Sequence, residues 1–236
     1  MNFLEGEILY LDKPIQWTSF DLVNKVRRKI SHFLKIKKIK VGHAGTLDPL
    51  ATGVMIICTG KATKKIDEYQ CQTKEYVAKL CLGATTPSFD RETEIDHRYE
   101  TDHITRERVE EVLSRFTGSI EQVPPAFSAC KINGDRAYDL ARKGLDVNLK
   151  PKLLVIDTIE LLSFSQTEIE LRIVCSKGTY IRALARDIGT ALDTGAYLIA
   201  LQRTKVGTIT LDNCLKIDEI DKIFTNIRDC ELVISS

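Results

Sequence analysis

The segment GHAGTLDPLATGV, residues 42–54, places a carboxylate among glycines directly before an apolar run. Asp48 precedes a proline, which biases its backbone toward extended geometry, and Gly42 and Gly45 allow backbone angles closed to other residues. Such a loop fixes the direction of one side chain and lets a large ligand approach the backbone closely. It would suit a catalytic carboxylate. The alternative is an acid that hydrogen-bonds its own turn in a hairpin.

The segment CSKGTYIRALARDIG, residues 175–189, predicts a strand, a glycine turn and then a helix that opens near Tyr180. Arg182 falls in the first turn of that helix. Unpaired amides, the helix dipole and a guanidinium together form an anion site. If Asp48 is the anion, its charged form is favoured even where water is excluded. An equally open alternative is that Arg182 binds a structural carboxylate or a phosphate.

Tyr76 stands at the start of a predicted strand, in KEYVAKLCLG. A tyrosine in a strand most often packs in the core or in an interface. The functional alternative is a ring on which a nucleobase stacks, with a phenol that hydrogen-bonds or takes a proton.

The elements that must position these residues indicate one mixed α+β domain spanning residues 1–236. Ser19 is expected to cap a helix with apolar residues at helical spacing, and Gly118 to end a helix in ITRERVEEVLSRFTG. The acidic stretch 88–105 predicts a surface loop, and residues 121–151 an ordered excursion from the core. Strands are predicted at EILYLDKP, GVMIICTG, KEYVAKLCLG, LLVIDTIELLSF, TEIELRIVCSKG and YLIALQRTKVGTITL.

The charge is close to balanced overall but uneven along the chain. The net charge of the 236 residues is +1, yet residues 25–40 hold eight Lys or Arg and no acid, and residues 90–111 hold nine acids against four bases. A basic stripe beside an acidic one can steer a polyanion to one face. The alternative is that both stretches are ordinary solvated surface.

Several classes of protein do not fit the composition. Seven cysteines without a C-x-x-C pair, several of them in apolar runs, indicate buried thiols in a reducing compartment, and the four histidines have no metal-ligand spacing. TGKAT, residues 59–63, is no phosphate-binding loop, because Met55 stands where its first glycine is required. The chain start has no basic signal region, and no apolar run reaches the roughly 18 residues of a membrane span. We therefore expect a cytoplasmic protein without metal.

At this point the motifs resemble a known family, the bacterial tRNA pseudouridine-55 synthases. The catalytic motif of that family is similar to GHAGTLDPLATGVMIICTGKATK, and its N-terminal motif to LDKPIQWTSF. Its remaining signatures look like KEYVAKLCLG, QVPPAFSACKINGDRAYDLARKG and the segment that runs from CSKGTYIRALARDIGTAL to YLIALQRTKVG, in the same order. The resemblance covers roughly residues 7–211.

The resemblance implies the pseudouridine synthase fold, a mostly antiparallel mixed sheet flanked by helices and loops. It also implies an isomerase that converts one uridine of the tRNA T loop to pseudouridine, without cofactor. By this resemblance Asp48 promotes cleavage of the glycosidic bond, Tyr76 stacks on the flipped base and is the candidate for removing its C5 proton, and Arg182 pairs with Asp48. Whether Asp48 forms a covalent adduct or promotes elimination stays open.

The same resemblance assigns residues to substrate binding. Tyr180 and Leu201 would line the nucleotide pocket, and His43 would fill the space that the flipped uridine leaves. Residues 121–151 match a thumb-like segment that clamps the T arm. A monomer is the default expectation.

Three departures from the family pattern bear on these expectations. Gln16 stands where the N-terminal motif usually has glycine, and Pro87 and Glu92 interrupt a stretch that usually runs Thr-x-Thr-x-Asp-x-x-Gly. Many relatives continue into a separate C-terminal RNA-binding (PUA) domain, whereas only about 25 residues follow the last motif here, too few for a domain. The chain is therefore expected to have no such domain. Two rival functions remain: a non-catalytic tRNA-binding or folding protein, and the same chemistry on another hairpin that resembles the T arm.

Overall fold

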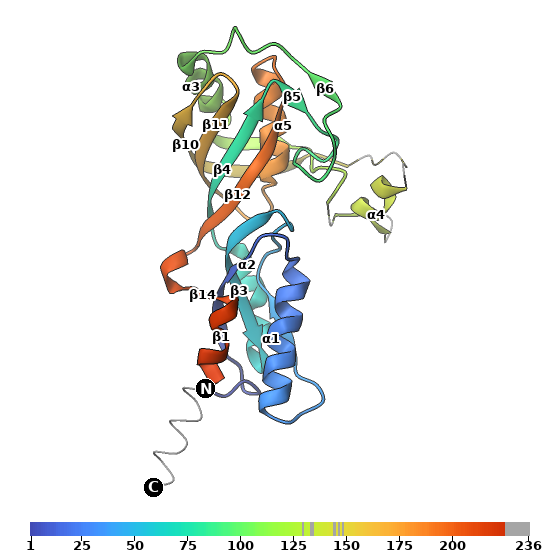
Figure 1. Cartoon of the computed structure of the whole chain (residues 1–236), viewed down its shortest axis with the longest axis vertical. Coiled ribbons are helices and arrows are strands. Elements are labelled where there is room, and N and C mark those ends of the chain that lie inside the picture. Colours follow the sequence, from blue (N-terminus) through green and yellow to red (C-terminus); the bar gives the residue numbers. More distant parts are fainter. Residues whose placement is uncertain (129, 133–134, 144, 146, 148, 225–236) are drawn as a thin grey trace. The chain divides into compact units, whose positions relative to one another are not determined.

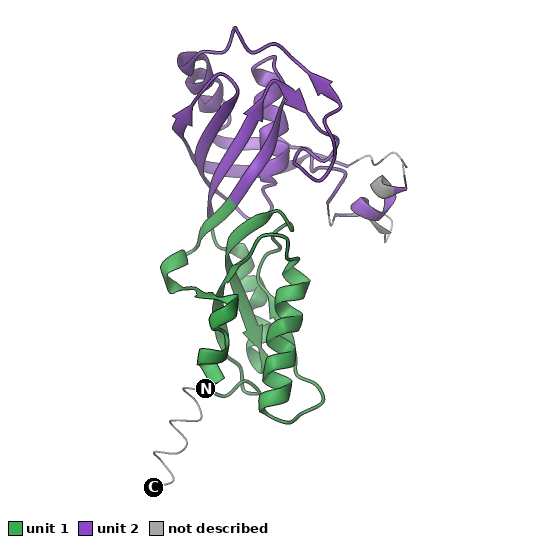
Figure 2. Ribbon diagram, in the orientation of Figure 1, with its two compact units in different colours: residues 1–74, 202–236 green, residues 75–201 purple. Residues whose placement is uncertain are grey.

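The structure, a computed structural model, describes residues 1–128, 130–132, 135–143, 145, 147 and 149–224 (Figure 1). The chain forms two compact units, coloured separately in Figure 2. Unit 1 comprises Met1–Lys74 with Gln202–Ser236, and unit 2 comprises Glu75–Leu201. The chain crosses from one unit to the other within two strands, β4 (Lys74–Leu82) and β12 (Ala196–Val206). The interpretation of residues 1–236 as a single catalytic domain stays a prediction.

Unit 1 is built on a sheet whose strand order is β14 (Leu215–Lys216), β1 (Ile8–Lys13), β3 (Ala51–Thr59) and the end of β12. The short strands β2 (Val41–His43) and β13 (Ile209–Thr210) pair with β3 and β12. β1 runs antiparallel to β3 and parallel to β14. Almost every residue of β3 is buried, as its continuous apolar run predicts. A six-residue 3₁₀ helix, Gly60–Lys65, and α2 (Ile66–Cys71) follow β3.

The main helix of unit 1 is α1 (Ser19–Phe33), which buries Leu22, Val23, Val26 and Ile30. The predicted cap is wrong by one residue. Thr18 caps the helix, and its hydroxyl accepts from the Asp21 amide while the Asp21 side chain accepts from the Thr18 amide. Ser19 is instead buried, with its hydroxyl bonded to Leu47. A tertiary partner has therefore taken the side chain that local sequence would use as the cap.

Unit 2 continues with the strand order β12, β4, β11 (Glu168–Cys175), β10 (Lys152–Phe164) and β7 (Gly118–Gln122). β10 is antiparallel to both β11 and β7, which confirms the predicted pair. β4 alternates strictly and buries Tyr76, Ala78, Leu80 and Leu82 on one face, as predicted. The described α-helices of unit 2 are α3 (Arg106–Ser114), α4 (Ala137–Arg142) and α5 (Ile181–Ala191). The expected α+β class with a mostly antiparallel sheet is confirmed.

Two expectations in unit 2 need correction or completion. The acidic stretch 88–105 is largely exposed, but it includes the two-residue strand β6 (His97–Arg98) paired with β5 (Ala84–Thr85), and Ser88 and Asp90 are buried. The helix α3 ends at Ser114, before Gly118, which begins β7 with a positive φ. Of the predicted insertion 121–151, the structure describes β8 (Lys131–Ile132), β9 (Asp135–Arg136) and α4, while residues 129, 133–134, 144, 146 and 148 lie outside the described residues.

Two searches of the described part of the chain bear on function. No helix there is both long and apolar enough to cross a bilayer. The described residues also contain no group of three or more His, Cys, Asp or Glu side chains placed to hold a metal ion.

Candidate active site

Asp48 lies in unit 1, in the tight turn that connects β2 to β3. The amide of Ala51 donates to the Asp48 carbonyl at 3.1 Å, so Asp48 and Pro49 form the first half of a turn. β2 pairs with β3 in a fixed register, with Gly42 opposite Cys58 and His43 opposite Ile57. The carboxylate therefore stands on a hairpin whose second strand is buried in the core, and it is partly exposed.

Residues around the start of α1 hold this turn in place. The buried hydroxyl of Ser19 donates to the Leu47 carbonyl and accepts from the Leu47 amide, both at 2.9 Å. The Gln16 amide donates to the Pro49 carbonyl at 2.8 Å. Gln16 itself has a φ of 66°, where the family pattern usually has glycine. Because L side chains rarely adopt that angle, this departure carries local backbone strain at a position that supports the Asp48 turn.

Lys13 is a site residue that the sequence analysis did not single out. It is completely buried, and its ammonium donates to the carbonyls of Pro14 at 3.0 Å and Trp17 at 2.6 Å, with a longer contact of 3.4 Å to Pro49. Burial lowers the pKa of Lys13 to about 8, while the nearby Asp48 carboxylate opposes that shift. A buried cation thus lies within electrostatic range of the Asp48 carboxylate.

The buried lysine makes the stability of the fold depend on pH. The pKa of Lys13 is about 8 in the folded chain against 10.5 for an ordinary lysine. Between these values the unfolded chain binds a proton that the folded chain has released, so the free energy of unfolding gains a contribution that rises with pH. We therefore expect the unfolding free energy of wild type to rise relative to that of Lys13→Met from pH 8 to pH 10, as measured by urea unfolding.

The control for this prediction is Lys64→Met, which removes one exposed positive charge from the same unit. Its unfolding free energy should stay parallel to that of wild type across the same pH range. Parallel curves for Lys13→Met would mean that the ammonium keeps its ordinary pKa despite its burial.

Arg203 supports the other side of the Asp48 loop. Its side chain is 1% exposed, and it donates to the Val54 carbonyl at 2.8 Å and the Gly45 carbonyl at 3.1 Å. Gly45 and Gly53 have φ angles of 96° and 108°, and a Cβ on Gly53 would come within 2.2 Å of the Arg203 carbonyl. Only glycine fits there. His43, partly exposed on β2, has its pKa lowered by burial and by the charge of Arg203, so the ring is neutral at pH 7.

Arg182 lies in unit 2, at the second position of α5, as predicted. It is 4% exposed and donates to the Phe127 carbonyl at 2.9 Å and the Ser88 carbonyl at 3.2 Å. Its Nε lies 3.6 Å from a carboxylate oxygen of Asp90, which is also buried. The contact agrees with the alternative that Arg182 binds a structural carboxylate. Through it Arg182 connects the acidic stretch 88–105 to the start of α5.

Tyr180 precedes Arg182 as the N-cap residue of α5. Gln122, at the end of β7, holds its backbone in a reciprocal pair: the Gln122 side chain donates to the Tyr180 carbonyl at 3.2 Å and accepts from its amide at 2.9 Å. The Tyr180 hydroxyl lies 3.2 Å from the Cys130 thiol. Gln122 was missed in the sequence analysis, because a glutamine in an exposed-looking strand carries no motif signal.

The remaining predicted site residues of unit 2 are Tyr76 and Leu201. Tyr76 is 8% exposed on the buried face of β4, and Leu201 is partly exposed on β12, at the last position of unit 2. The six predicted site residues therefore divide between the units. His43 and Asp48 share unit 1 with Lys13 and Arg203, and the other four share unit 2 with Asp90 and Gln122. The pairing of Arg182 with Asp48 stays a prediction.

Comparisons with known proteins cover nearly the whole chain. Residues 31–181 match the model of the TruB family pseudouridylate synthase (N terminal domain), and residues 182–232 that of the tRNA pseudouridylate synthase B C-terminal domain. The chain is 68% identical over 221 residues to the protein named tRNA pseudouridine synthase B of Parabacteroides distasonis, an overlap of 94% of each chain.

Two solved structures are similar in fold. A chain in the crystal structure of a Cbf5–Nop10–Gar1 complex superposes with a TM-score of 0.69 at 27% identity, over 92% of this chain and 54% of that one. A chain in an H/ACA RNP bound to a substrate RNA containing 2′-deoxyuridine gives a TM-score of 0.64 at 26% identity, over 92% and 53%. The present chain thus spans about half the length of these solved chains.

Proposed function

Because the chain belongs to the TruB family of pseudouridylate synthases, we propose that it isomerises one uridine in the T loop of tRNA to pseudouridine. The observation that carries this proposal is the Asp48 turn, held by Ser19, Gln16 and Lys13 in a chain 68% identical to a tRNA pseudouridine synthase B. A protein that only binds RNA has no use for a fixed carboxylate beside phosphates, which the carboxylate repels.

The chemistry requires a carboxylate that stays ionised. Cleavage of the bond between C1′ and N1 develops positive charge on the ribose, which an adjacent carboxylate stabilises or traps at C1′. In our proposal that group is Asp48, and the freed uracil then turns so that C5 forms the new bond to C1′. The C5 proton leaves to a base, for which Tyr76 is the candidate, and N1 gains a proton. Bonds and charges balance, and no cofactor enters the reaction.

The target uridine must leave its stack before Asp48 can reach it. Extrusion costs a few kcal/mol, and stacking on an aromatic side chain returns about 1–3 kcal/mol per base. We assign the stacking surface to Tyr76 and the rest of the nucleotide pocket to Tyr180 and Leu201. The neutral ring of His43 suits the assigned role of replacing the extruded base, because an uncharged ring stacks without bringing a buried charge.

We further propose that the reaction takes place in the cytoplasm, that its substrate is tRNA, and that a monomer of the chain carries it out. The six cysteines in the described part of the chain are all free thiols, which fits a reducing compartment. Recognition of the T stem-loop is assigned to residues 121–151.

The direct test uses tRNA labelled with tritium at C5 of uridine. We expect the chain to release tritium from the unmodified transcript and from a minimal T stem-loop, with pseudouridine as the product. A T stem-loop with a scrambled loop serves as the control and should release none. Tight tRNA binding without tritium release would favour the non-catalytic rival. Equal turnover on the scrambled loop would move the substrate to another RNA hairpin.

A further inference from the structure

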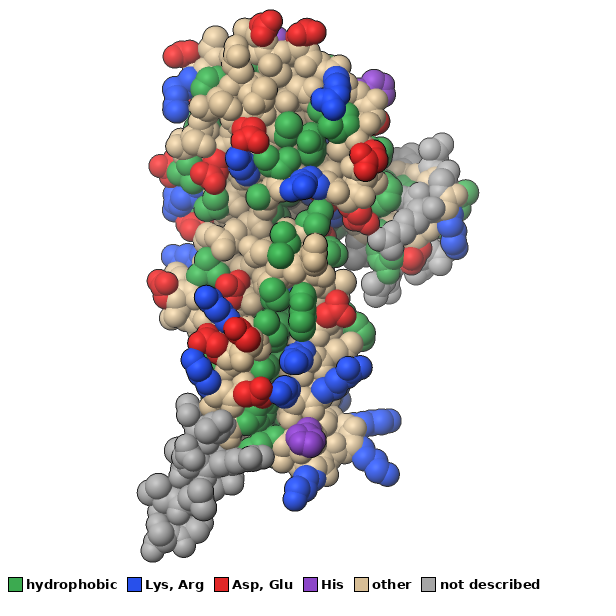
Figure 3. Space-filling view, viewed as in Figure 1, with side chains coloured by type: hydrophobic (Ala, Val, Ile, Leu, Met, Phe, Trp, Pro, Cys, Tyr) green, Lys and Arg blue, Asp and Glu red, His purple; other side chains and the backbone are tan. Residues whose placement is uncertain are grey.

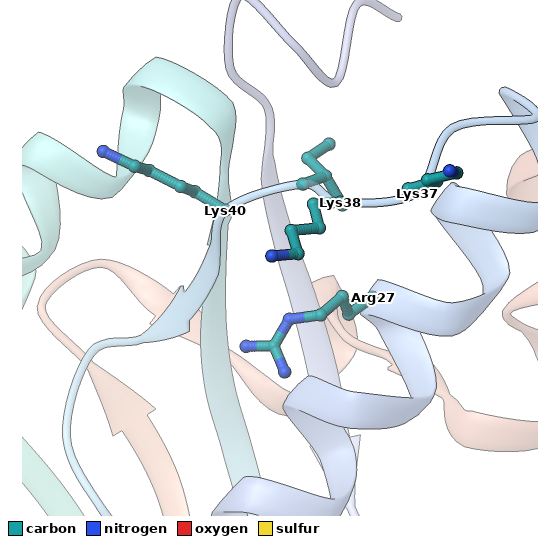
Figure 4. Close-up of a pocket in the computed structure, with 5 residues that line it drawn as sticks. Arg27, Lys37, Lys38 and Lys40 are labelled. Carbon is teal, nitrogen blue, oxygen red and sulfur yellow. The ribbon is translucent and has the colours of Figure 1, made fainter.

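An open pocket of about 460 Å³ lies on unit 1 between α1 and the segment that follows it. Four of its five lining residues are cations: Arg27, Lys37, Lys38 and Lys40, with Ile39 as the fifth (Figure 4). Lys and Arg side chains gather over this part of unit 1 in the space-filling view (Figure 3). None of these five residues is among those assigned to the reacting uridine.

The backbone beneath the pocket is well anchored. Lys35, two residues after the end of α1, has a φ of 53°, and the Ile36 amide donates to the Ser31 carbonyl at 3.0 Å. Ile39 is 8% exposed and packs the segment onto the core. The Lys40 carbonyl accepts from the Gly60 amide at 2.9 Å. The lysines therefore project from a fixed segment.

Two hydrogen bonds within the chain orient the Arg27 side chain before any ligand binds. Its guanidinium donates to the Asn24 side chain at 2.6 Å and to the Val41 carbonyl at 3.1 Å. A guanidinium has five N–H donors, so these two bonds leave others for a ligand. In Figure 4 the ends of Arg27 and Lys38 point into the same part of the pocket, while Lys37 and Lys40 extend in opposite directions. The arrangement has a centre and two arms.

In the described part of unit 1, some cations pair with an acid, and the four pocket cations do not. Lys29, on the same helix, pairs with Asp221 at 2.7 Å, and Lys61 pairs with Glu5 at 2.7 Å. Within the described residues, none of the four pocket cations forms an ion pair, and no acid lines the pocket. Like charges that converge repel one another, and a bound anion removes that repulsion.

The helix dipole does not account for the cluster. The carboxyl end of a helix favours cations only within its last turn, and Arg27 stands six positions before the end of α1 at Phe33. A turn holds 3.6 residues. The side chain at the centre of the pocket therefore lies outside the reach of that effect.

We propose that this pocket binds a backbone phosphate of the RNA substrate, with Arg27 and Lys38 on one phosphate and Lys37 and Lys40 toward its neighbours. A phosphodiester chain carries charges at intervals in both directions, which matches a centre with two arms. The aliphatic stems of the lysines offer an apolar surface to the sugar. The identity of the ligand as RNA rests on the proposed function, whereas the phosphate chemistry rests on the pocket itself.

The test compares two triple variants with the same change of charge. The pocket variant is Lys37→Gln/Lys38→Gln/Lys40→Gln. The control is Lys25→Gln/Arg28→Gln/Lys35→Gln, three equally exposed cations of the same basic stretch that do not line the pocket. Arg27→Lys, which keeps the charge and loses the fork, is measured beside them. Urea unfolding of each variant establishes that it is folded.

The readout is the salt dependence of tRNA binding. Each lost phosphate contact lowers the slope of log K against log salt by about 0.7–0.9. We expect the pocket variant to lose about 2 in slope and to bind roughly 10- to 100-fold more weakly near 0.1 M salt, with the control losing less than 1. KM should rise in the pocket variant while kcat at saturating RNA stays close to wild type.

Three outcomes would contradict the assignment of this pocket to RNA phosphate. The first is an unchanged salt slope for tRNA binding in the pocket variant, and the second is an equal loss of slope in both triple variants. The third is a pocket variant that loses binding to phosphatidylserine vesicles while its salt slope for tRNA stays intact. The proposed function fails separately, if wild type binds tRNA and forms no pseudouridine, because the slopes can still be measured.

Discussion

Asp48→Asn is expected to reduce tritium release from C5-labelled tRNA by at least about 10³-fold, since removing the group that reacts with the sugar removes the main source of catalysis. The substitution preserves shape. The contacts of Ser19, Gln16 and Lys13 with the backbone of residues 47–49 remain in this variant, so the loop should keep its position. Binding of tRNA should change by only a few-fold.

Asp67→Asn is the matched control, because it neutralises an exposed acid of the same unit. Its activity should remain within about twofold of wild type. Tritium release that survives Asp48→Asn would remove Asp48 from the reaction and leave the proposed mechanism without its catalytic group. Loss of tRNA binding in Asp48→Asn would show that the carboxylate acts in assembly of the complex.

Arg182→Met is expected to destabilise the chain by about 3–5 kcal/mol, the usual cost of breaking a buried ion pair on one side. Asp90 would keep a buried charge, and the carbonyls of Ser88 and Phe127 would lose their donor. The double variant Arg182→Met/Asp90→Asn removes both charges and should recover much of the loss. Urea unfolding measures the three free energies that this comparison requires.

The same variants separate the structural role of Arg182 from its proposed catalytic one. If Arg182 also pairs with Asp48, the double variant should recover stability and remain inactive by about 10²-fold or more in single-turnover tritium release. Recovery of activity together with stability would confine Arg182 to holding Asp90. Additive effects of the two substitutions on stability would contradict the ion pair itself.

Local pattern was enough to predict much of the fold. The continuous apolar run of β3, the alternation of β4, the helical spacing of α1 and the opening of α5 at Tyr180 all follow from residues close together in sequence. The backbone hydrogen bonds of each element are made within the helix or with a neighbouring strand. The spacing of apolar residues is therefore enough to decide whether a segment forms a helix or a strand, and these predictions are confirmed.

The sequence by itself also determined which groups are chemically available, since the types and order of Asp48, Tyr76, Tyr180 and Arg182 are visible as motifs. Only the tertiary structure decided their partners. Ser19 left its capping role for Leu47, Lys13 became a buried cation near Asp48, and Arg182 met Asp90. The physical reason is distance. Hydrogen bonds and ion pairs depend on ångström-scale separations between residues tens of positions apart, and chain packing sets those separations.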